Sequence, residues 1–99
     1  MRHMNRVVSV ELTRTECVAL RETIERTPLF EGRTEVRDAV RDILRGRQLS
    51  PLRVDQSVIV ALARRIVPID VPTATIRSKL DRALVESYLA EDTAIADVA

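Results

Sequence analysis

Residues 35–45 carry the pattern that most restricts what this chain can fold into. The apolar residues of this stretch recur at positions i, i+3, i+4, i+7 and i+8: Val36, Ala39, Val40, Ile43 and Leu44. That spacing places them on one face of an α-helix, and such a face must be buried against another element. Thr34 is the predicted N-cap, and Gly46 stands where a left-handed residue often ends a helix.

Helical spacing recurs in three further stretches and predicts helices at about 14–26, 55–66 and 74–90. The first of these begins at "TRTE", in which Thr13 and Glu16 match a capping box. The first and third helices are followed by Pro28 and Pro68, and the residue before a proline disfavours the helical conformation.

The starts of the third and fourth helices are left open by the sequence. Asp55 is a suitable cap for the third helix, but Ser50 could also cap an earlier turn with Pro51 at the first helical position. Thr73 and Thr75 are both suitable caps for the fourth helix. These alternatives change the boundaries of the helices and leave their number at four.

The predicted fold class is all-α, a compact bundle of four main helices built as two αα-hairpins. Val8, Val10 and Leu12 alternate as in a strand, but we identify no second strand to pair with them and interpret them as an extended lead-in. At an offset of 40 residues the two hairpins share five identities: Leu12/Leu52, Val18/Val58, Pro28/Pro68, Arg37/Arg77 and Leu44/Leu84. This is either an internal duplication or the ordinary likeness of two amphipathic hairpins.

We divide the chain into a lead-in (1–12), one helical domain (13–90) and a tail (91–99). The first residues are interpreted as an expression remnant or as the stretch before a second start at Met4. In the tail, "EDTAIADVA", the helical periodicity is lost, so we expect it to fray or to be disordered. With 99 residues, 45% of them apolar and 31% charged, the chain has the composition of one small globular domain.

The sequence also indicates the cellular compartment in which the protein is expected. Its apolar runs are too short to cross a bilayer, and its opening lacks the pattern of a secretory signal. The single cysteine, Cys17, cannot form an internal disulfide, which is typical of a reducing compartment. We therefore expect a cytoplasmic protein that does not contact membranes.

Catalytic and cofactor chemistry is not indicated. One histidine, His3, and one cysteine cannot supply the ligands of a metal site. Cys17 lies on an apolar stripe without an ordered histidine to activate it, so we interpret it as a small core residue. Two glycines cannot build a loop that cradles phosphate. We predict a non-enzymatic protein with no metal, no cofactor and no small-molecule substrate.

Charge is distributed unevenly along the chain. Six arginines make up a basic row on the second helix and the linker after it: Arg33, Arg37, Arg41, Arg45, Arg47 and Arg53. The four on the helix recur every four residues and so form one slanting ridge. Against three acids, these six arginines give residues 33–53 a balance of +3, whereas three basic and six acidic residues give residues 68–99 a balance of −3. The candidate acidic counter-surface consists of Asp81, Glu86, Glu91 and Asp92.

The arginine row has two interpretations: a surface for an anionic partner, or a solvated face on which Asp38 and Asp42 pair locally with arginine. We favour a protein-interaction module or small adaptor, whose partner is another protein or a second copy bound head to tail. The alternative function is a small nucleic-acid-binding regulator. It is less favoured because the gaps between predicted helices exceed a helix-turn-helix turn and stacking aromatics are lacking. A phage-type inhibitor or structural protein is a third alternative.

The stretch "LRETIERTPLFEGRTEVRDAVRDIL" (20–44) resembles the opening of bacterial effector-associated domains, which are small, death-fold-like helical adaptors. In that family a first helix with a leucine-rich end is followed by proline and then by an arginine that starts a second amphipathic helix. The matching positions are Leu20, Ile24, Pro28, Arg37, Val40 and Leu44. The resemblance implies homotypic protein–protein recruitment without catalysis.

Overall fold

The chain forms two strands and four helices in the order strand, helix, helix, strand, helix, helix. The structure is a computed structural model that describes residues 6–46 and 51–98, with residues 91–98 described by their helical backbone. The elements are β1 (Val7–Val10), α1 (Arg14–Arg26), α2 (Arg33–Leu44), β2 (Leu52–Asp55), α3 (Gln56–Arg65) and α4 (Val71–Val98). The prediction of a mostly helical, compact domain with four main helices is confirmed, and a small two-stranded sheet that was not predicted is present beside the helices.

The two strands form a small antiparallel sheet. Val8 lies opposite Val54 and Val10 lies opposite Leu52, and all four side chains are buried. The predicted lead-in therefore contains strand β1, and its partner, β2, lies in the stretch that we interpreted as a linker. "LRVD" shows the same alternation as "VVSV", but with only two apolar residues next to Pro51 it is too short to be recognised as a strand by periodicity.

The N-terminal ends of α1 to α3 test the predicted caps. The capping box of α1 is present, with the Thr13 hydroxyl accepting from the Glu16 amide and the Glu16 carboxylate accepting from the Thr13 amide. The N-cap of α2 is Gly32 in a left-handed conformation, so the prediction of Thr34 is wrong. Asp55 occupies the N-cap position of α3 without a side-chain cap, and the earlier start at Pro51 is wrong because β2 intervenes.

Helix α4 is longer than predicted at both ends. It begins at Val71, and Asp70 caps it: the Asp70 carboxylate accepts from the Thr73 amide at 2.9 Å, and the Thr73 hydroxyl accepts from the Asp70 amide at 3.1 Å. Thr73 therefore lies inside the first turn, and the prediction of a cap at Thr73 or Thr75 is wrong. The helical backbone also runs on to Val98. That the tail (91–99) frays or is disordered stays a prediction.

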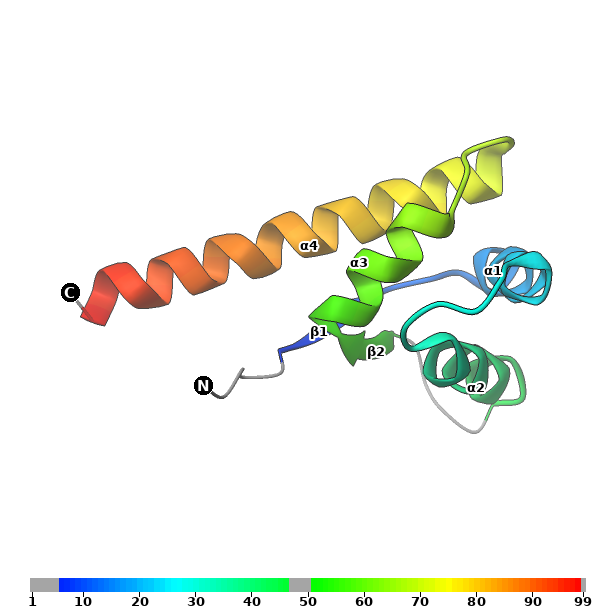
Figure 1. Cartoon of the computed structure of the whole chain (residues 1–99), viewed down its shortest axis with the longest axis horizontal. Helices are drawn as coiled ribbons and strands as arrows, with labels where there is room; N and C mark the ends of the chain where they lie inside the picture. Colours follow the sequence, from blue (N-terminus) through cyan, green and yellow to red (C-terminus); the bar gives the residue numbers. More distant parts are fainter. Residues whose placement is uncertain (1–5, 47–50, 99) are drawn as a thin grey trace.

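The helices and the sheet share one hydrophobic core. Its fully buried large side chains come from every helix and from β2: Leu20, Ile24, Val36, Val40, Leu52, Ile59, Leu62, Ile66, Ile76 and Leu80. Helices α1 and α2 contact each other, as do α3 and α4, and we refer to these two pairs as the first and the second hairpin. Helix α4 follows the long axis of the 44 × 27 × 25 Å domain, and its C-terminal half projects beyond the other described elements (Figure 1).

The two glycines provide a matched test of this packing. Both have positive φ, but a Cβ at Gly32 would lie 2.4 Å from Val58 Cγ2, whereas a Cβ at Gly46 would meet nothing within 4 Å. We expect Gly46→Ala to cost only the left-handed strain of alanine, about 1–2 kcal/mol. Gly32→Ala adds an overpacking cost of roughly 1–3 kcal/mol. Urea unfolding of the two variants measures the difference, and equal losses of stability would contradict the close approach of the α1–α2 turn to α3.

Candidate interaction surfaces

Some arginines of the row on α2 make hydrogen bonds or ion pairs within the domain. Arg33, the first residue of α2, is half-buried, and its Nη2 donates to the carbonyl oxygen of Ile24 at 3.0 Å. Arg14, the first residue of α1, donates from Nη1 to the carbonyl oxygen of Leu44 at 3.3 Å. Each helix of this antiparallel pair thus supplies an arginine to the C-terminal end of the other. These contacts satisfy carbonyl groups that a helix end leaves exposed and place positive charge at the negative ends of the helix dipoles.

The second hairpin uses the same device. Arg77, in the second turn of α4, donates from Nη1 to the carbonyl oxygen of Ile66 at 3.1 Å, directly after the end of α3. Its Nε lies 3.4 Å from the carboxylate of Asp81, one turn further along α4. Arg37 and Arg77 correspond at an offset of 40 residues, but the residue that performs the equivalent capping in the first hairpin is Arg33.

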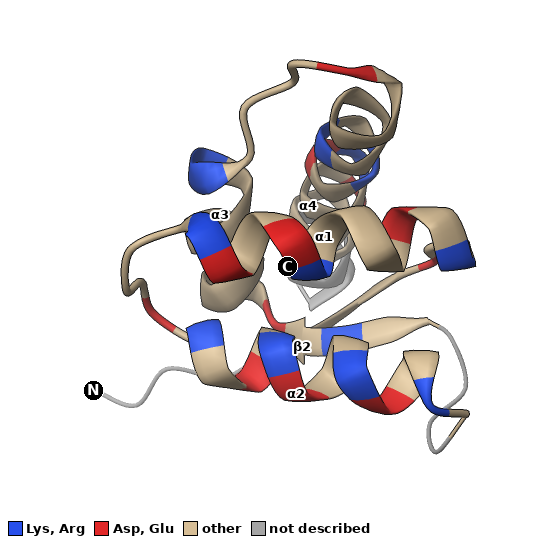
Figure 2. Ribbon diagram, turned by 90° about the vertical axis from the view of Figure 1, so that its right-hand side faces the viewer, with Lys and Arg blue, Asp and Glu red and all other residues tan. Residues whose placement is uncertain are grey.

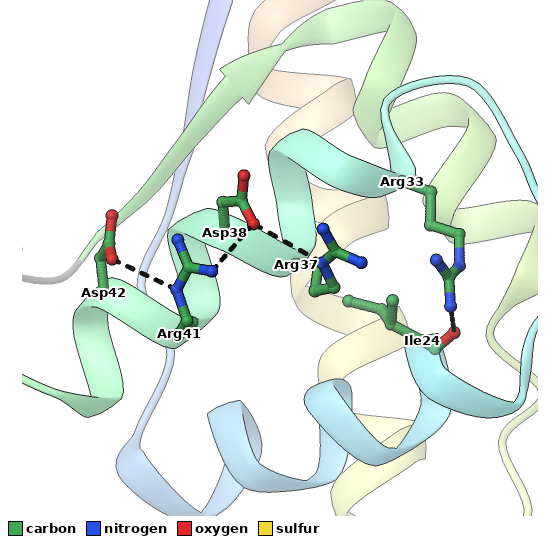
Figure 3. A network of polar contacts seen from close by, with 6 residues as sticks. All are labelled: Ile24, Arg33, Arg37, Asp38, Arg41 and Asp42. Atoms are coloured by element: carbon green, nitrogen blue, oxygen red, sulfur yellow. Dashed lines mark hydrogen bonds and ion pairs between the residues drawn. The ribbon is translucent and has the colours of Figure 1, made fainter.

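Two further arginines of the row are paired along α2. Asp38 Oδ1 lies 3.5 Å from Arg37 Nε and 3.4 Å from Arg41 Nη1, and Arg41 Nε lies 3.6 Å from Asp42 (Figure 3). The side chains of these ion pairs are about 34–46% exposed, so each pair contributes little to stability. They do alternate the charge along the helix (Figure 2), so α2 does not present an uninterrupted basic ridge.

The remaining predicted site residues are dispersed. Arg45 follows α2 and is exposed, and Arg53 is exposed on the outer face of β2. Arg47 lies outside the described residues. Of the acidic set, Asp81 pairs with Arg77, Glu86 is exposed on α4, and Glu91 and Asp92 fall on the projecting part of that helix, where side chains are not described. The basic row and the acidic set therefore lie on different elements, α2 with β2 and α4.

One charged pair joins the two halves of the domain. Lys79 Nζ lies 2.6 Å from Glu16 Oε1, and the Glu16 side chain is only 8% exposed. Burial by itself raises the pKa of Glu16, but the hydrogen bonds from Lys79 and Thr13 outweigh it, and the net effect lowers the pKa. The α1 capping box is thereby linked to the middle of α4. Lys79 is the only lysine of the chain. Its contact with Glu16 joins residues 63 positions apart, so the local sequence pattern does not predict it.

Cys17 is buried, as expected for a small core residue. Burial raises the pKa of its thiol, and the neighbouring carboxylate of Glu16 adds to this effect. A raised pKa keeps the thiol protonated and unreactive near neutral pH. Among the described residues, no group of three His, Cys, Asp or Glu side chains is arranged to hold a metal ion.

Exposed large apolar side chains gather at two places that the sequence analysis missed. One group lies in the α3–α4 connection and at the start of α4: Val67, Ile69 and Val71. Leu29 is exposed in the α1–α2 turn. A second group lies along α4: Val85, Tyr88 and Leu89. The spacing of the second group, i, i+3 and i+4, could have indicated a separate apolar face beside the core stripe of α4. Within the described parts of the chain, no helix is both long and apolar enough to cross a membrane.

The chain matches no protein-family model, no curated protein and no solved structure. The resemblance of residues 20–44 to effector-associated domains accordingly stays a prediction, and the surfaces described above are the basis for any functional inference.

The internal role of Arg33 can be tested against its neighbour in the row. We expect Arg33→Ala to lower the free energy of unfolding by about 1–2 kcal/mol, because a partly buried hydrogen bond is lost. Arg37→Ala removes only an exposed pair and should cost no more than about 0.5 kcal/mol. Chemical denaturation of both variants measures this. If Arg37→Ala is the more damaging change, the assignment of Arg33 as the structural arginine is wrong.

The ion pair of Glu16 predicts an acid dependence. Because the folded-state pKa is lowered, its stabilisation is present above the unfolded pKa, about 4.3–4.5, and is lost as the pH falls through the folded value. We expect Glu16→Gln to reduce stability at pH 7 and to make stability less sensitive to acid below pH about 4.5. Denaturant unfolding across this range measures the effect, with Glu22→Gln on the exposed side of α1 as the control for the amide. Equal acid sensitivity in Glu16→Gln and the wild type would contradict this assignment.

Proposed function

We propose that this chain is a non-enzymatic protein-interaction module that associates head to tail with copies of itself. The observation that carries the proposal is the projecting half of α4, which extends beyond the other described elements while α4 leaves Val85, Tyr88 and Leu89 about half exposed (Figure 1). An isolated helix of this length is marginal in water, so a projecting helix gains stability when a partner covers it. Exposed apolar residues that lie together are typical of protein contact sites.

The chemistry of the projecting half favours a basic partner. After Arg82 the chain carries no basic residue, and four acids follow: Glu86, Glu91, Asp92 and Asp97. Two such acidic helices would repel each other, so side-by-side pairing of the projecting halves is disfavoured. We refer to the part of α4 from Val85 to Val98 as the acidic tip.

The opposite end of the domain has complementary properties. The α3–α4 connection lies at the far end of the long axis from the tip (Figure 1), and it exposes Val67 and Ile69, with Val71 following at the start of α4. Arg64 and Arg65 close α3 at this end and are exposed. We refer to Arg64–Val71 as the basic end.

Residues of α1 and of the α1–α2 turn extend the basic end. Arg64 and Arg65 line a shallow depression together with Phe30 and Glu31 of that turn. The pKa of Asp70 is lowered by hydrogen bonds from Thr73 and, to a smaller extent, by Arg26 at the end of α1. Arg26 therefore contributes a third positive charge near the α3–α4 connection, so that three arginines stand against the two carboxylates of Asp70 and Glu31.

The two surfaces support a heterologous contact. A tip that is acidic and apolar meets an end that is basic and apolar, and the two lie at opposite ends of one molecule. Contacts of this kind repeat from copy to copy and form rings or open chains. Complementary charge orients the encounter, and the apolar side chains exclude water from the contact.

The α2 face is the competing basic surface. Its Arg37 and Arg41 are paired with Asp38, which weakens its attraction for an acidic helix. The same pairing reduces the attraction of this face for nucleic-acid phosphates. A nucleic-acid-binding role is therefore less favoured than protein interaction. We therefore place the contact at the basic end.

Sedimentation velocity at low and high salt tests the proposal with three double variants. Glu91→Lys with Asp92→Lys reverses the tip, Arg64→Glu with Arg65→Glu reverses the basic end, and Arg37→Glu with Arg41→Glu reverses the α2 face. We expect the wild type to form species larger than a dimer at low salt and to dissociate as salt is raised. The tip and basic-end variants should each be monomeric, and the α2 variant should assemble like the wild type.

Mixing the first two variants provides the decisive control. A reversed tip matches a reversed basic end, and the unaltered surfaces still match each other, so the equimolar mixture should assemble although neither component does. A wild type that is monomeric at low salt and about 100 μM would contradict self-association. Assembly that only the α2 variant abolishes would place the contact on α2 instead.

A further inference from the structure

Strand β1 has a free edge. The amide of Gln56 donates to the carbonyl of Arg6 at 2.8 Å, and the register pairs Val8 with Val54 and Val10 with Leu52. In an antiparallel ladder hydrogen-bonded pairs alternate, so Val8 and Val10 direct their main-chain groups toward β2. Val7 and Ser9 then direct theirs outward, and these groups have no hydrogen-bond partner among the described residues. The edge thus presents two donors and two acceptors at the spacing that another strand requires.

A groove runs along this edge. It has a volume of about 580 Å³ and lies between residues 7–11 and one flank of α4, formed by Lys79, Arg82, Ala83, Glu86 and Ser87. The wall residues span eight helical steps, about 12 Å, and the strand residues span four steps, about 13 Å. The helix wall therefore accompanies the strand along its whole length.

We propose that this groove binds one extended peptide segment of a partner protein, which adds a third strand to the sheet beside β1. Main-chain hydrogen bonds to Val7 and Ser9 supply affinity, as in other cases of strand addition. The groove lies away from the basic end, and its α4 wall shares only Glu86 and Ser87 with the acidic tip. The inference rests on the free edge of β1, which head-to-tail association does not use.

A second copy is a poor occupant of the groove. Helix α4 lies against β1 but makes no close contact with the described residues of β2, so it covers the β1 side of the sheet. A second β1 in the groove would bring its own α4 to the same place. A single extended segment carries no such helix.

The wall specifies the chemistry of the segment. Alternate side chains of an added strand point to opposite sides, so one set faces α4 and the other faces solvent beside Val7 and Ser9. On the α4 side, Lys79 is held by Glu16, whereas Arg82 is exposed and has no ion pair with a described residue. Ala83 leaves room for an apolar side chain next to it. Glu11 and Glu86 also line the groove and disfavour acidic side chains beside them. The segment that fits therefore has an acidic residue only where it faces Arg82 and a small apolar residue where it faces Ala83.

Selection from random eight-residue peptides displayed on phage, followed by titration of a selected synthetic peptide into ¹⁵N-labelled protein, tests the proposal. We expect chemical-shift changes at residues 7–11 and 79–87. Ser9→Pro removes an outward-facing donor without breaking the ladder to β2, because proline is tolerated at a strand edge. It should weaken binding about tenfold or more, whereas Ser9→Ala, which keeps the amide, should bind like the wild type.

Two further measurements complete the test. N-methylation of alternate residues of the peptide should abolish binding in one register and leave it intact in the other, which only strand addition predicts. The Ser9→Pro protein must give the wild-type pattern of amide resonances away from β1. Failure to select any peptide, shifts confined to another surface, or equal binding by Ser9→Pro would overturn the proposal. A dimer of the wild type that Ser9→Pro abolishes would also overturn it and assign the edge to a second copy.

Discussion

Pairing of β1 with β2 is the constraint on which the arrangement of the domain depends. It joins two segments separated by the whole of the first hairpin and fixes which residues face the core, because a shift of one residue would turn Val8 and Val10 to solvent. With the register set, α2 lies beside β2 and α4 lies beside β1. The same register leaves the main-chain groups of Val7 and Ser9 without a partner in the described part of the chain, so the edge that defines the groove is a direct consequence of it.

Polar contacts at the helix ends hold the hairpins in this arrangement. Arg14, Arg33 and Arg77 each donate to a carbonyl at the end of a neighbouring helix, and Lys79 joins α4 to the capping box of α1. These four basic side chains therefore have partners within the domain. The exposed apolar groups at the two ends of the domain are consequently the more informative surface features.

Much of the fold can be predicted from the sequence, and the features that could not be predicted have physical reasons. Helix α1 and the apolar stripe of α2 were predictable because periodicity and the Thr13 capping box are local signals. The sheet was not, because β2 contributes two buried residues and is defined by pairing with a distant segment. The candidate site was predicted as a row of arginines without the distances to Ile24, Asp38 and Asp42 that give Arg33, Arg37 and Arg41 internal partners. Long-range contacts such as Glu16–Lys79 cannot be predicted from the residues next to either partner in the sequence.

Hydrogen exchange of the β1 main-chain amides, followed by NMR, shows whether β1 pairs on one side only. We expect slow exchange at Val8 and Val10, whose amides are directed toward β2, and fast exchange at Val7 and Ser9, whose amides face the groove. Uniform protection along β1 would show that the outer edge is already covered. Fast exchange at all four residues would show that the strand pair, and the groove built on it, does not form.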